Sequence, residues 1–409
     1  MVAGTLVAQQ SPADDAIAVA RAGHYDSALT LLSRARATDP GNADLQLAEA
    51  RVLGWAGRRR ETIARYDSLL RRDPRSVDAM VGLGYVYHWE GREGAANRLA
   101  DEALRLSSGN TDAMELRRVI RRATRGSAEV SADWNNDSDR NTNFRQTVSL
   151  TSPMTGGVRL LGSVGALEAS DPLRDATRIG GEAGLAWSIG KLSASALAGA
   201  RRLDPETGPS RTEATYRGNV SLRPSSRFGI GAGYARYPFD DIASLFERDL
   251  TVELLEAGLE AHSSVGLVLA GGGGALWISD ANRRVDGHAS VTQEIGRHLA
   301  VGVSGRALGY RQPAVGYFSP NRFHLLEATA SAGVGSERWD GRLSGGIGGQ
   351  QVGRGGDTQT EWHIEGRVGR NWGEGNRVEV FGGVTNSAVS STTGAFRYRS
   401  AGLLLRIGI

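Results

Sequence analysis

The chain of 409 residues contains no cysteine. It therefore has no disulfide framework, no thiolate metal site and no cysteine nucleophile. It also lacks any run of roughly 18 apolar residues, the length that a membrane-spanning helix requires, which argues against a helical integral membrane protein. The same absence does not argue against a membrane β-barrel, because each strand of such a barrel gives a much weaker hydropathy signal. The formal net charge is only +3, which does not indicate nucleic acid as a partner.

Histidine is scarce as well, with 7 residues scattered along the chain. A hydrolase would need a nucleophile, a base and an orienting group that converge. No serine-containing elbow accompanies the histidines, and no two of them share a plausible ligand spacing for a metal. We therefore expect no enzyme, no metal site and no cofactor.

Glycine, in contrast, is abundant, with 56 residues, most of which follow Gly126. This shift in composition divides the chain into a first domain over residues 11–125 and a second over residues 126–409. Residues 1–10, MVAGTLVAQQ, are similar to the end of a signal peptide with a small-x-small cleavage site. We interpret them as a residual signal-like segment whose true start lies upstream.

The first domain is an internal repeat. Gly23, Gly57 and Gly91 recur with a period of 34 residues, and Pro40 and Pro74 keep the same spacing. Each unit reads as a helix, a glycine turn, a second helix and a stop. This pattern resembles the tetratricopeptide repeat (TPR), an α-solenoid of stacked helix pairs. About three repeats, closed by a capping helix over residues 111–125, are expected.

A repeated pair of side chains suggests a binding face on this solenoid. Trp55 and Trp89 occupy the same repeat position, and Arg58 and Arg92 follow each of them by three residues. The TPR resemblance implies that this position lies near the concave face. An aromatic ring with a cation could stack on sugar rings or hold a peptide. Alternatively, the tryptophans merely pack between neighbouring repeats.

After Gly126 the helical pattern gives way to alternation with a period of two. In residues 212–223, for example, Tyr216 and Val220 lie on one face, whereas Glu213 and Arg217 lie on the other. Reading such runs in order predicts about sixteen strands, although fourteen is not excluded. Alternation alone would also fit a soluble β-sandwich. The lengths of the connections between the strands distinguish a sandwich from a membrane β-barrel.

The connections fall into two classes. Every second one is mostly a tight turn, and the intervening ones are mostly longer and polar, among them SDPLRDA, PFDDIASLFERD and RQPAVGYFSPN. Tight turns at one end and long loops at the other are typical of a transmembrane antiparallel β-barrel of the outer membrane. Closure leaves such a sheet no free edge. Aromatic residues, including Tyr237, Phe239, Tyr317 and Phe318, are expected near the membrane interface at the long-loop end.

The polar face of the strands would then line the pore. The predicted lumen residues are Arg178, Glu182, Glu213, Arg217, Arg223, His363, Arg367 and Arg406. These side chains either stay hydrated and contact a solute, or simply pair across a narrow lumen. In the final strand, Leu403, Leu405, Ile407 and Ile409 are predicted to face lipid. The same register sends Arg397 and Arg399 toward lipid, unless a bulge near Ser400 changes it or those arginines lie above the hydrocarbon.

The two domains together resemble the YaiO-like family, and more loosely the porins that export cellulose and poly-N-acetylglucosamine. The repeat segment VLGWAGRRRETIARYDSLLRRDP and the glycine-rich strands after it carry this resemblance. It implies an outer-membrane pore or export protein, in contact with outer-membrane lipid, with its TPR domain in the periplasm. That domain would recruit a protein partner or guide a polysaccharide. The alternative is a non-transporting scaffold, in which the barrel is an anchor and the repeats assemble envelope proteins.

Overall fold

The computed structural model describes residues 11–225, 227–296, 298–336 and 338–409. The signal-like segment 1–10 lies outside this range. The chain divides into a helical unit, which ends at Thr124, and a β unit, which begins at Arg125. Every described helix is too short or too polar to span a bilayer.

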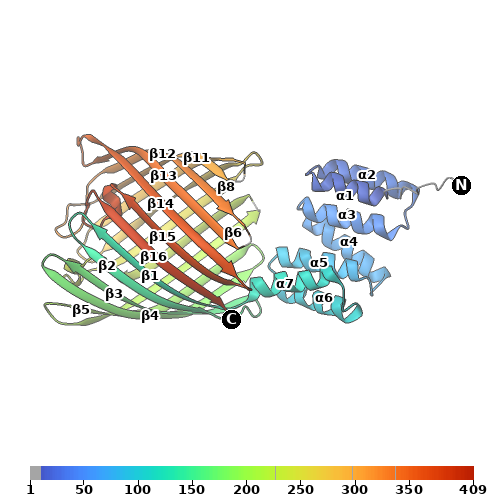
Figure 1. Ribbon diagram of the computed structural model, residues 1–409, viewed down its shortest axis with the longest axis horizontal. Helices are drawn as coiled ribbons and strands as arrows, with labels where there is room; N and C mark the ends of the chain where they lie inside the picture. Colours follow the sequence, from blue (N-terminus) through green and yellow to red (C-terminus); the bar gives the residue numbers. More distant parts are fainter. Residues whose placement is uncertain (1–10, 226, 297, 337) are drawn as a thin grey trace. The chain divides into compact units, whose positions relative to one another are not determined.

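The helical unit is a TPR α-solenoid, as the repeat predicts (Figure 1). Its helices form consecutive antiparallel pairs, and a last helix follows them. They are α1 (Pro12–Arg21), α2 (Tyr25–Thr38), α3 (Ala43–Trp55), α4 (Arg59–Arg72), α5 (Val77–Trp89), α6 (Glu93–Leu106) and α7 (Thr111–Thr124).

The periodic glycines end the first helix of each pair. Gly23, Gly57 and Gly91 have φ angles of 89°, 75° and 70°, a left-handed conformation that side chains with a Cβ resist. At the second turn the N–H of Arg58 donates to the carbonyl of Leu53, the long-range bond of a Schellman motif. Glycine at these positions therefore allows the chain to reverse between paired helices.

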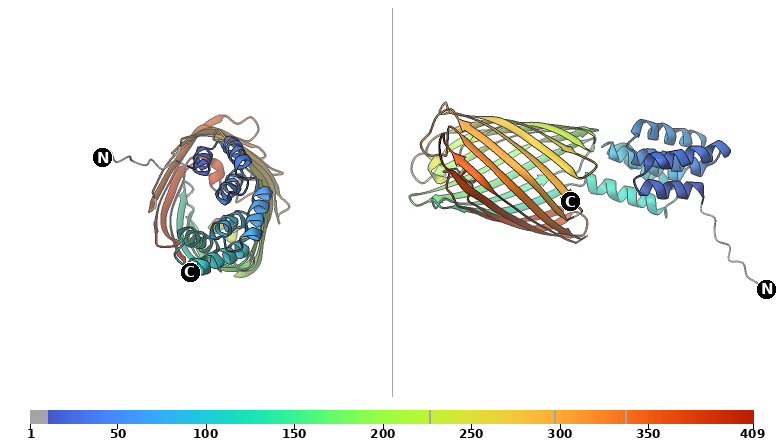
Figure 2. Two further views of the ribbon diagram at one scale, coloured as in Figure 1. Left: turned by 90° about the vertical axis from the view of Figure 1, so that its right-hand side faces the viewer. Right: turned by 90° about the horizontal axis from the view of Figure 1, so that it is seen from above.

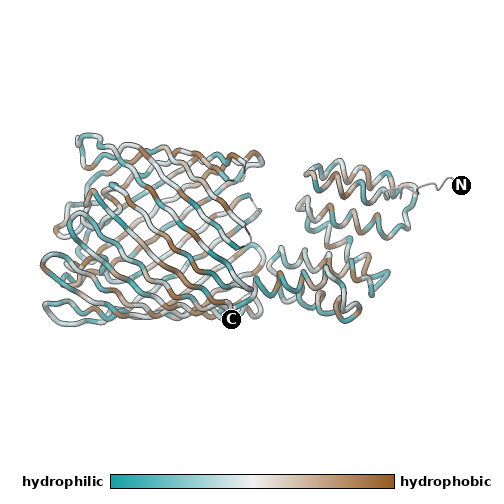
Figure 3. The backbone as a smooth tube through the Cα atoms, in the orientation of Figure 1, coloured by the Kyte–Doolittle hydropathy of each residue, from teal (hydrophilic) through white to brown (hydrophobic). Residues whose placement is uncertain are grey.

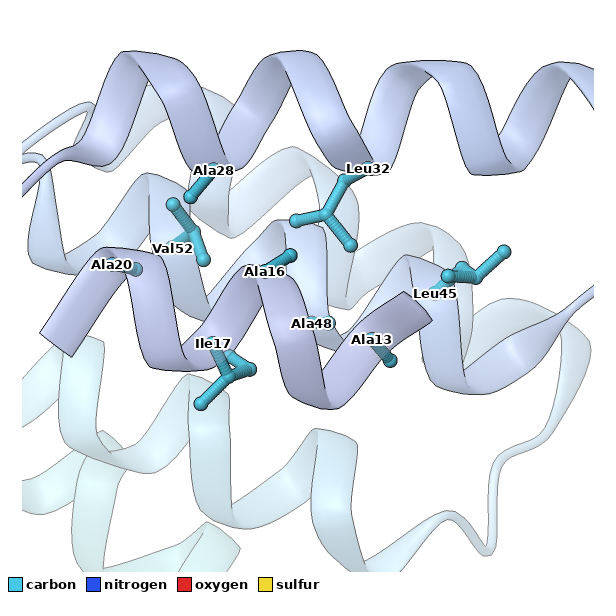
Figure 4. Packing of buried hydrophobic residues seen from close by; sticks show 9 residues of the cluster. All are labelled: Ala13, Ala16, Ile17, Ala20, Ala28, Leu32, Leu45, Ala48 and Val52. Atoms are coloured by element: carbon cyan, nitrogen blue, oxygen red, sulfur yellow. The ribbon is translucent and has the colours of Figure 1, made fainter. Parts of the chain in front are cut away.

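Small residues let the paired helices approach closely. Where the first two repeats meet, α1, α2 and α3 pack through Ala16, Ala28, Leu32 and Val52, all of them fully buried (Figure 4). Similar clusters join the later helices. Burial of these apolar surfaces between neighbouring pairs supplies most of the stability of a solenoid.

The second unit is a closed antiparallel β-barrel of sixteen strands, in which each strand pairs with its neighbours in sequence (Figures 1 and 2). The first strand pairs with the last, with Val130 opposite Leu405. The strands are β1 (Ser127–Asp137), β2 (Thr142–Thr151), β3 (Val158–Asp171), β4 (Arg174–Ile189), β5 (Leu192–Pro205), β6 (Arg211–Ser225), β7 (Phe228–Pro238), β8 (Thr251–His262), β9 (Leu267–Ile278), β10 (Arg283–Ile295), β11 (Leu299–Tyr310), β12 (Phe323–Gly335), β13 (Trp339–Val352), β14 (Thr358–Trp372), β15 (Asn376–Thr385) and β16 (Tyr398–Gly408).

The two faces of the barrel wall differ in chemistry, and hydropathy changes over short distances along the strands (Figure 3). Large apolar side chains such as Ile179, Leu326 and Ile347 are exposed on one face. The residues between them, such as Arg178 and Glu327, are polar and more buried. The first face is the outside of the barrel and the second lines its lumen, because successive side chains of a strand point to opposite faces.

The final strand keeps one register throughout. Pairing runs without a shift from Tyr398 to Gly408 with β1 and from Tyr398 to Arg406 with β15. The bulge considered near Ser400 is therefore absent, and Arg399 shares the outer face with Leu403 and Leu405. It lies four residues before Leu403, at the loop end of the strand, which fits an arginine placed above an apolar band.

Three loops at one end of the barrel are much longer than the others, namely residues 239–250, 311–322 and 386–397. The sequence predicted the first two of these. It was wrong about SDPLRDA, because β3 continues to Asp171 and β4 begins at Arg174. The polar residues of that segment extend the hairpin instead of forming a long loop.

Candidate functional site

The long loop 239–250 turns inward at its end of the barrel. Its short helix α8 (Ala243–Phe246) packs against the inner face of β3, β4 and β5. Phe246 is fully buried there, in a cluster with Leu167, Ala176 and Leu203. These partners are on the strand face opposite to the exposed apolar side chains. The loop therefore covers part of the lumen wall.

An ion-pair network fixes this loop to the wall. Asp240 Oδ2 lies 2.9 Å from Arg178 Nη1, and its Oδ1 lies 3.3 Å from Arg201 Nη1. The side chain of Asp240 is only 2% exposed. The amide of Asn143 on β2 adds a hydrogen bond to the carbonyl of Asp241 (2.9 Å). A carboxylate buried this deeply needs such partners, since an unpaired buried charge is strongly destabilising.

The other two long loops join the first. The Arg248 guanidinium lies against Gly316, where an added Cβ would come within 2.7 Å of it. The N–H of Phe318 donates to the carbonyl of Thr392 (2.7 Å). Ser391 Oγ in turn donates to Asp137 Oδ2 at the end of β1 (2.6 Å). Contacts thus run from loop to loop around this mouth of the barrel, which the three segments restrict.

Aromatic residues in and beside these loops pack against one another at this mouth, where Tyr317 is buried and Tyr237, Phe239 and Phe318 are half-buried. Tyr317 is 5% exposed and packs with Phe239 and Tyr237 near Ile242 and Leu245. Its hydroxyl donates to Asp280 Oδ2 (2.8 Å) and accepts from the amide of Asn282 (2.8 Å). Phe318 packs against Phe323. The expectation that Tyr237, Phe239, Tyr317 and Phe318 sit at a membrane interface is therefore corrected: they hold the inward loops in place.

Most of the predicted lumen residues have charged partners. Arg178 pairs with Asp240, Glu182 with Arg217 (2.6 Å), Glu213 with Arg211 (4.0 Å) and Arg406 with Glu129 (2.7 Å). His363 lies beside Glu327 and Glu361. Arg223 and Arg367 are both exposed. The structure thus spreads these residues around the wall and joins them in local pairs.

A hollow of about 320 Å³ lies on the helical unit between α3, α5 and their neighbours. Trp55 and Trp89 both line it, together with Arg51, Tyr66 and Asp112. Trp89 is 44% exposed, so it is available to a ligand. Burial raises the pKa of the Tyr66 hydroxyl to about 12.

The two arginines expected beside these tryptophans do not line the hollow. Arg58 is bound to Glu61 three residues later (2.7 Å), and Arg92 lies over the ring of Tyr87 (4.0 Å). Both occupy the turns that precede α4 and α6. The cation at the hollow is Arg51 instead. It lies one helical turn before Trp55, a spacing that places two side chains on the same helix face and that could have indicated it from the sequence.

Sequence reasoning also missed Asp240 and Arg201, the residues that fix the inward loop. PFDDIASLFERD reads as a polar exposed loop with scattered apolar residues. One available signal was its helix-like spacing of Ile242, Leu245 and Phe246, which suggests a buried apolar face. The strands that this loop packs against could not have been identified, because they are distant in the sequence and no local pattern links them to the loop.

No protein-family model matches the chain, and no curated protein matches it. Among solved structures, the chain is similar to one described as a bacterial polysaccharide outer membrane secretin, with 13% identity and a TM-score of 0.57, over 69% of this chain and 99% of that one. It aligns more weakly with CdiB from Acinetobacter baumannii, with 10% identity and a TM-score of 0.44, over 69% of this chain and 60% of that one. A thermophilic TPR protein from Thermus thermophilus aligns with 21% identity and a TM-score of 0.25, over 27% of this chain and 62% of that one. At such identities the first likeness shows the barrel fold alone, and the other two carry no argument.

Proposed function

We propose that the protein is an outer-membrane pore or export protein whose TPR unit lies in the periplasm. One observation carries this proposal: the closed barrel is apolar outside and polar inside. A row of exposed Leu, Ile and Val costs free energy in water but is favourable in hydrocarbon. Both ends of the barrel sequence meet at the tight-turn end, where Ser127 lies opposite Gly408. In outer-membrane barrels short turns are periplasmic, which supports a periplasmic position for the helices.

The wall chemistry favours an uncharged or weakly charged polar solute. Charges of both signs occur in local pairs, such as Glu182–Arg217 and Glu129–Arg406, so neither sign dominates. A polysaccharide is the solute class that the resemblance to export porins suggests. The similar barrel described as a polysaccharide secretin is consistent with it. The inward loops would then regulate exit at the long-loop mouth.

Oligosaccharide permeation of liposomes tests this proposal. Asp240→Asn removes the charge that holds Arg178 and Arg201, at a cost of about 3–5 kcal/mol to loop docking. Liposomes with this variant should swell in neutral glucose oligomers faster than liposomes with the unmodified chain. Asp204→Asn is the matched control, since Asp204 pairs with Arg202 on the same strand but is not in the restriction. Equal swelling of both variants and of protein-free liposomes would contradict the proposal.

A second candidate function is favoured by the tryptophan hollow. An anchored scaffold would use it to hold a periplasmic protein segment, whereas a polysaccharide guide would stack sugar rings on Trp89. The Trp89→Ala chain, compared with Trp339→Ala on the barrel, should lose whichever ligand the hollow binds. Retention of a protein but not of glycan by the unmodified chain would favour the scaffold.

A further inference from the structure

Two carboxylates and an imidazole meet on the inner wall, on strands that take no part in the Asp240 network. Glu327 extends from β12, whereas Glu361 and His363 extend from β14. His363 Nδ1 lies 3.1 Å from Glu327 Oε2 and 3.7 Å from Glu361 Oε1. One ligand atom from each residue lies within 4.8 Å of the others, which is close enough for one ion to contact all three.

The strand between them provides the room. β13 separates β12 from β14 and presents Gly346 and Gly348 where the three side chains converge. A Cβ on Gly346 would come within 2.5 Å of His363 Cε1 and 2.8 Å of Glu327 Oε2. On Gly348 it would lie 2.5 Å from Glu327 Cα. Any larger residue would therefore push the cluster apart.

The carboxylates are buried and incompletely satisfied. The side chain of Glu361 is 1% exposed and that of Glu327 is 10% exposed. Oε2 of each makes no hydrogen bond of good geometry, and Glu327 Oε2 has only the His363 Nδ1 contact at 3.1 Å described above. Ser304 Oγ donates a hydrogen bond to Glu327 Oε1, and Thr385 Oγ1 donates one to Glu361 Oε1. Among the described residues, His363 is the basic side chain that contacts these carboxylates, and no arginine or lysine forms an ion pair with either of them. Burying two neighbouring carboxylates is costly when both are ionised.

We propose that Glu327, Glu361 and His363 bind a divalent first-row transition-metal ion, with Zn²⁺ as the representative. One imidazole nitrogen and two carboxylate oxygens suit this class. Ca²⁺ and Mg²⁺ require six or more oxygen ligands. Three protein ligands leave one position to water. The bound ion would link β12 to β14 across β13. The sequence expectation of no metal site considered only histidine pairs and missed Glu361 and His363, two residues apart on one strand face.

Calorimetry on the refolded full chain, freed of metal by a chelator, tests the proposal. Zn²⁺ should bind with a stoichiometry of one, and His363→Ala should weaken the affinity by about 100-fold or more, because a ligand is lost. His288→Ala is the matched control, since this histidine shares the inner face in β10 but belongs to no such cluster within the described residues. X-ray absorption of the zinc complex should show one imidazole and otherwise oxygen ligands.

A second pair of variants keeps all three ligands. Gly346→Ala should weaken Zn²⁺ binding by about tenfold or more through crowding, whereas Gly341→Ala, on the outer face of the same strand with only ordinary contacts at its Cβ, should not. The heat-dependent shift in gel mobility of a folded barrel verifies that each variant is assembled. An assembled chain that binds no Zn²⁺, or whose affinity is unchanged in His363→Ala, overturns the proposal. This result is independent of pore conductance.

Discussion

Gly82 and Gly94 in the helical unit differ in what an added methyl group would meet. A Cβ on Gly82 in α5 would lie 2.4 Å from the Tyr66 ring, whereas one on Gly94 in α6 has only Arg98 Nη1 nearby, at 3.9 Å. Gly82→Ala should therefore lower the free energy of unfolding of the helices by about 1–3 kcal/mol. Gly94→Ala should raise it by about 0.5–1 kcal/mol, since alanine loses less backbone entropy in a helix.

Thermal unfolding, followed by helical circular dichroism at 222 nm on the full chain in detergent, measures both changes. A loss of stability for Gly94→Ala that equals the loss for Gly82→Ala would show that helix propensity and packing are not the deciding factors.

The buried hydroxyl of Tyr66 predicts a pH dependence. Its folded pKa is raised to about 12 by burial, from the ordinary value of 10.0. Above pH 10 the unfolded chain releases this proton and the folded chain does not, so the folded state loses stability as the pH rises from about 10 to 12. The loss from this group should reach about 1.4 kcal/mol at pH 11. Tyr66→Phe should remove that part of the decline, measured as the difference between the two chains in helical unfolding at pH 8 and pH 11. A parallel decline in both would refute the role of Tyr66.

At the scale of the element, the closing strand β16 distinguishes the two faces of the barrel. Leu403 faces outward at 47% exposure, while Leu404 lines the inner wall. Leu403→Arg should cost about 2–4 kcal/mol if its position is near the bilayer midplane. Leu404→Arg should be tolerated better, because the lumen is polar and Leu404 lies opposite Glu379 of β15. The fraction of chain that folds into lipid vesicles, read from heat-modifiable gel mobility, compares them. Equal folding yields would contradict the assignment of faces.

Elements with a local signal could be predicted from the sequence. The periodic glycines mark each helix turn, and alternation marks each strand, so Gly57 and the run 212–223 were interpretable without structure. The inward loops were not, because Phe246 finds its partners on β3 to β5 and Tyr317 finds its partner Asp280 beyond β9. The cluster of Glu327 and His363 depends on barrel register, which brings β12 and β14 to either side of Gly346. The face on which a strand side chain lies could be predicted from the period of two. The contacts between distant strands and loops could be seen only in the folded structure.

At the scale of the whole molecule, the barrel combines a polar lumen, an apolar outer surface and a mouth restricted by three loops. The loops contribute their own apolar clusters, so they form an internal part of the barrel and not only its surface. The carboxylate of Asp240 attaches the first loop, and hydrogen bonds to Asp280 and Asp137 attach the other two.

Single-channel conductance in planar lipid bilayers tests this central claim most directly. The full chain is compared with a chain in which residues 241–249 are replaced by a short glycine-serine turn, after both are shown to be folded barrels. We expect discrete but small conductance steps for the full chain and steps several-fold larger for the shortened chain. Equal steps in both, or no steps in either, would contradict a polar conduit restricted by its inward loops.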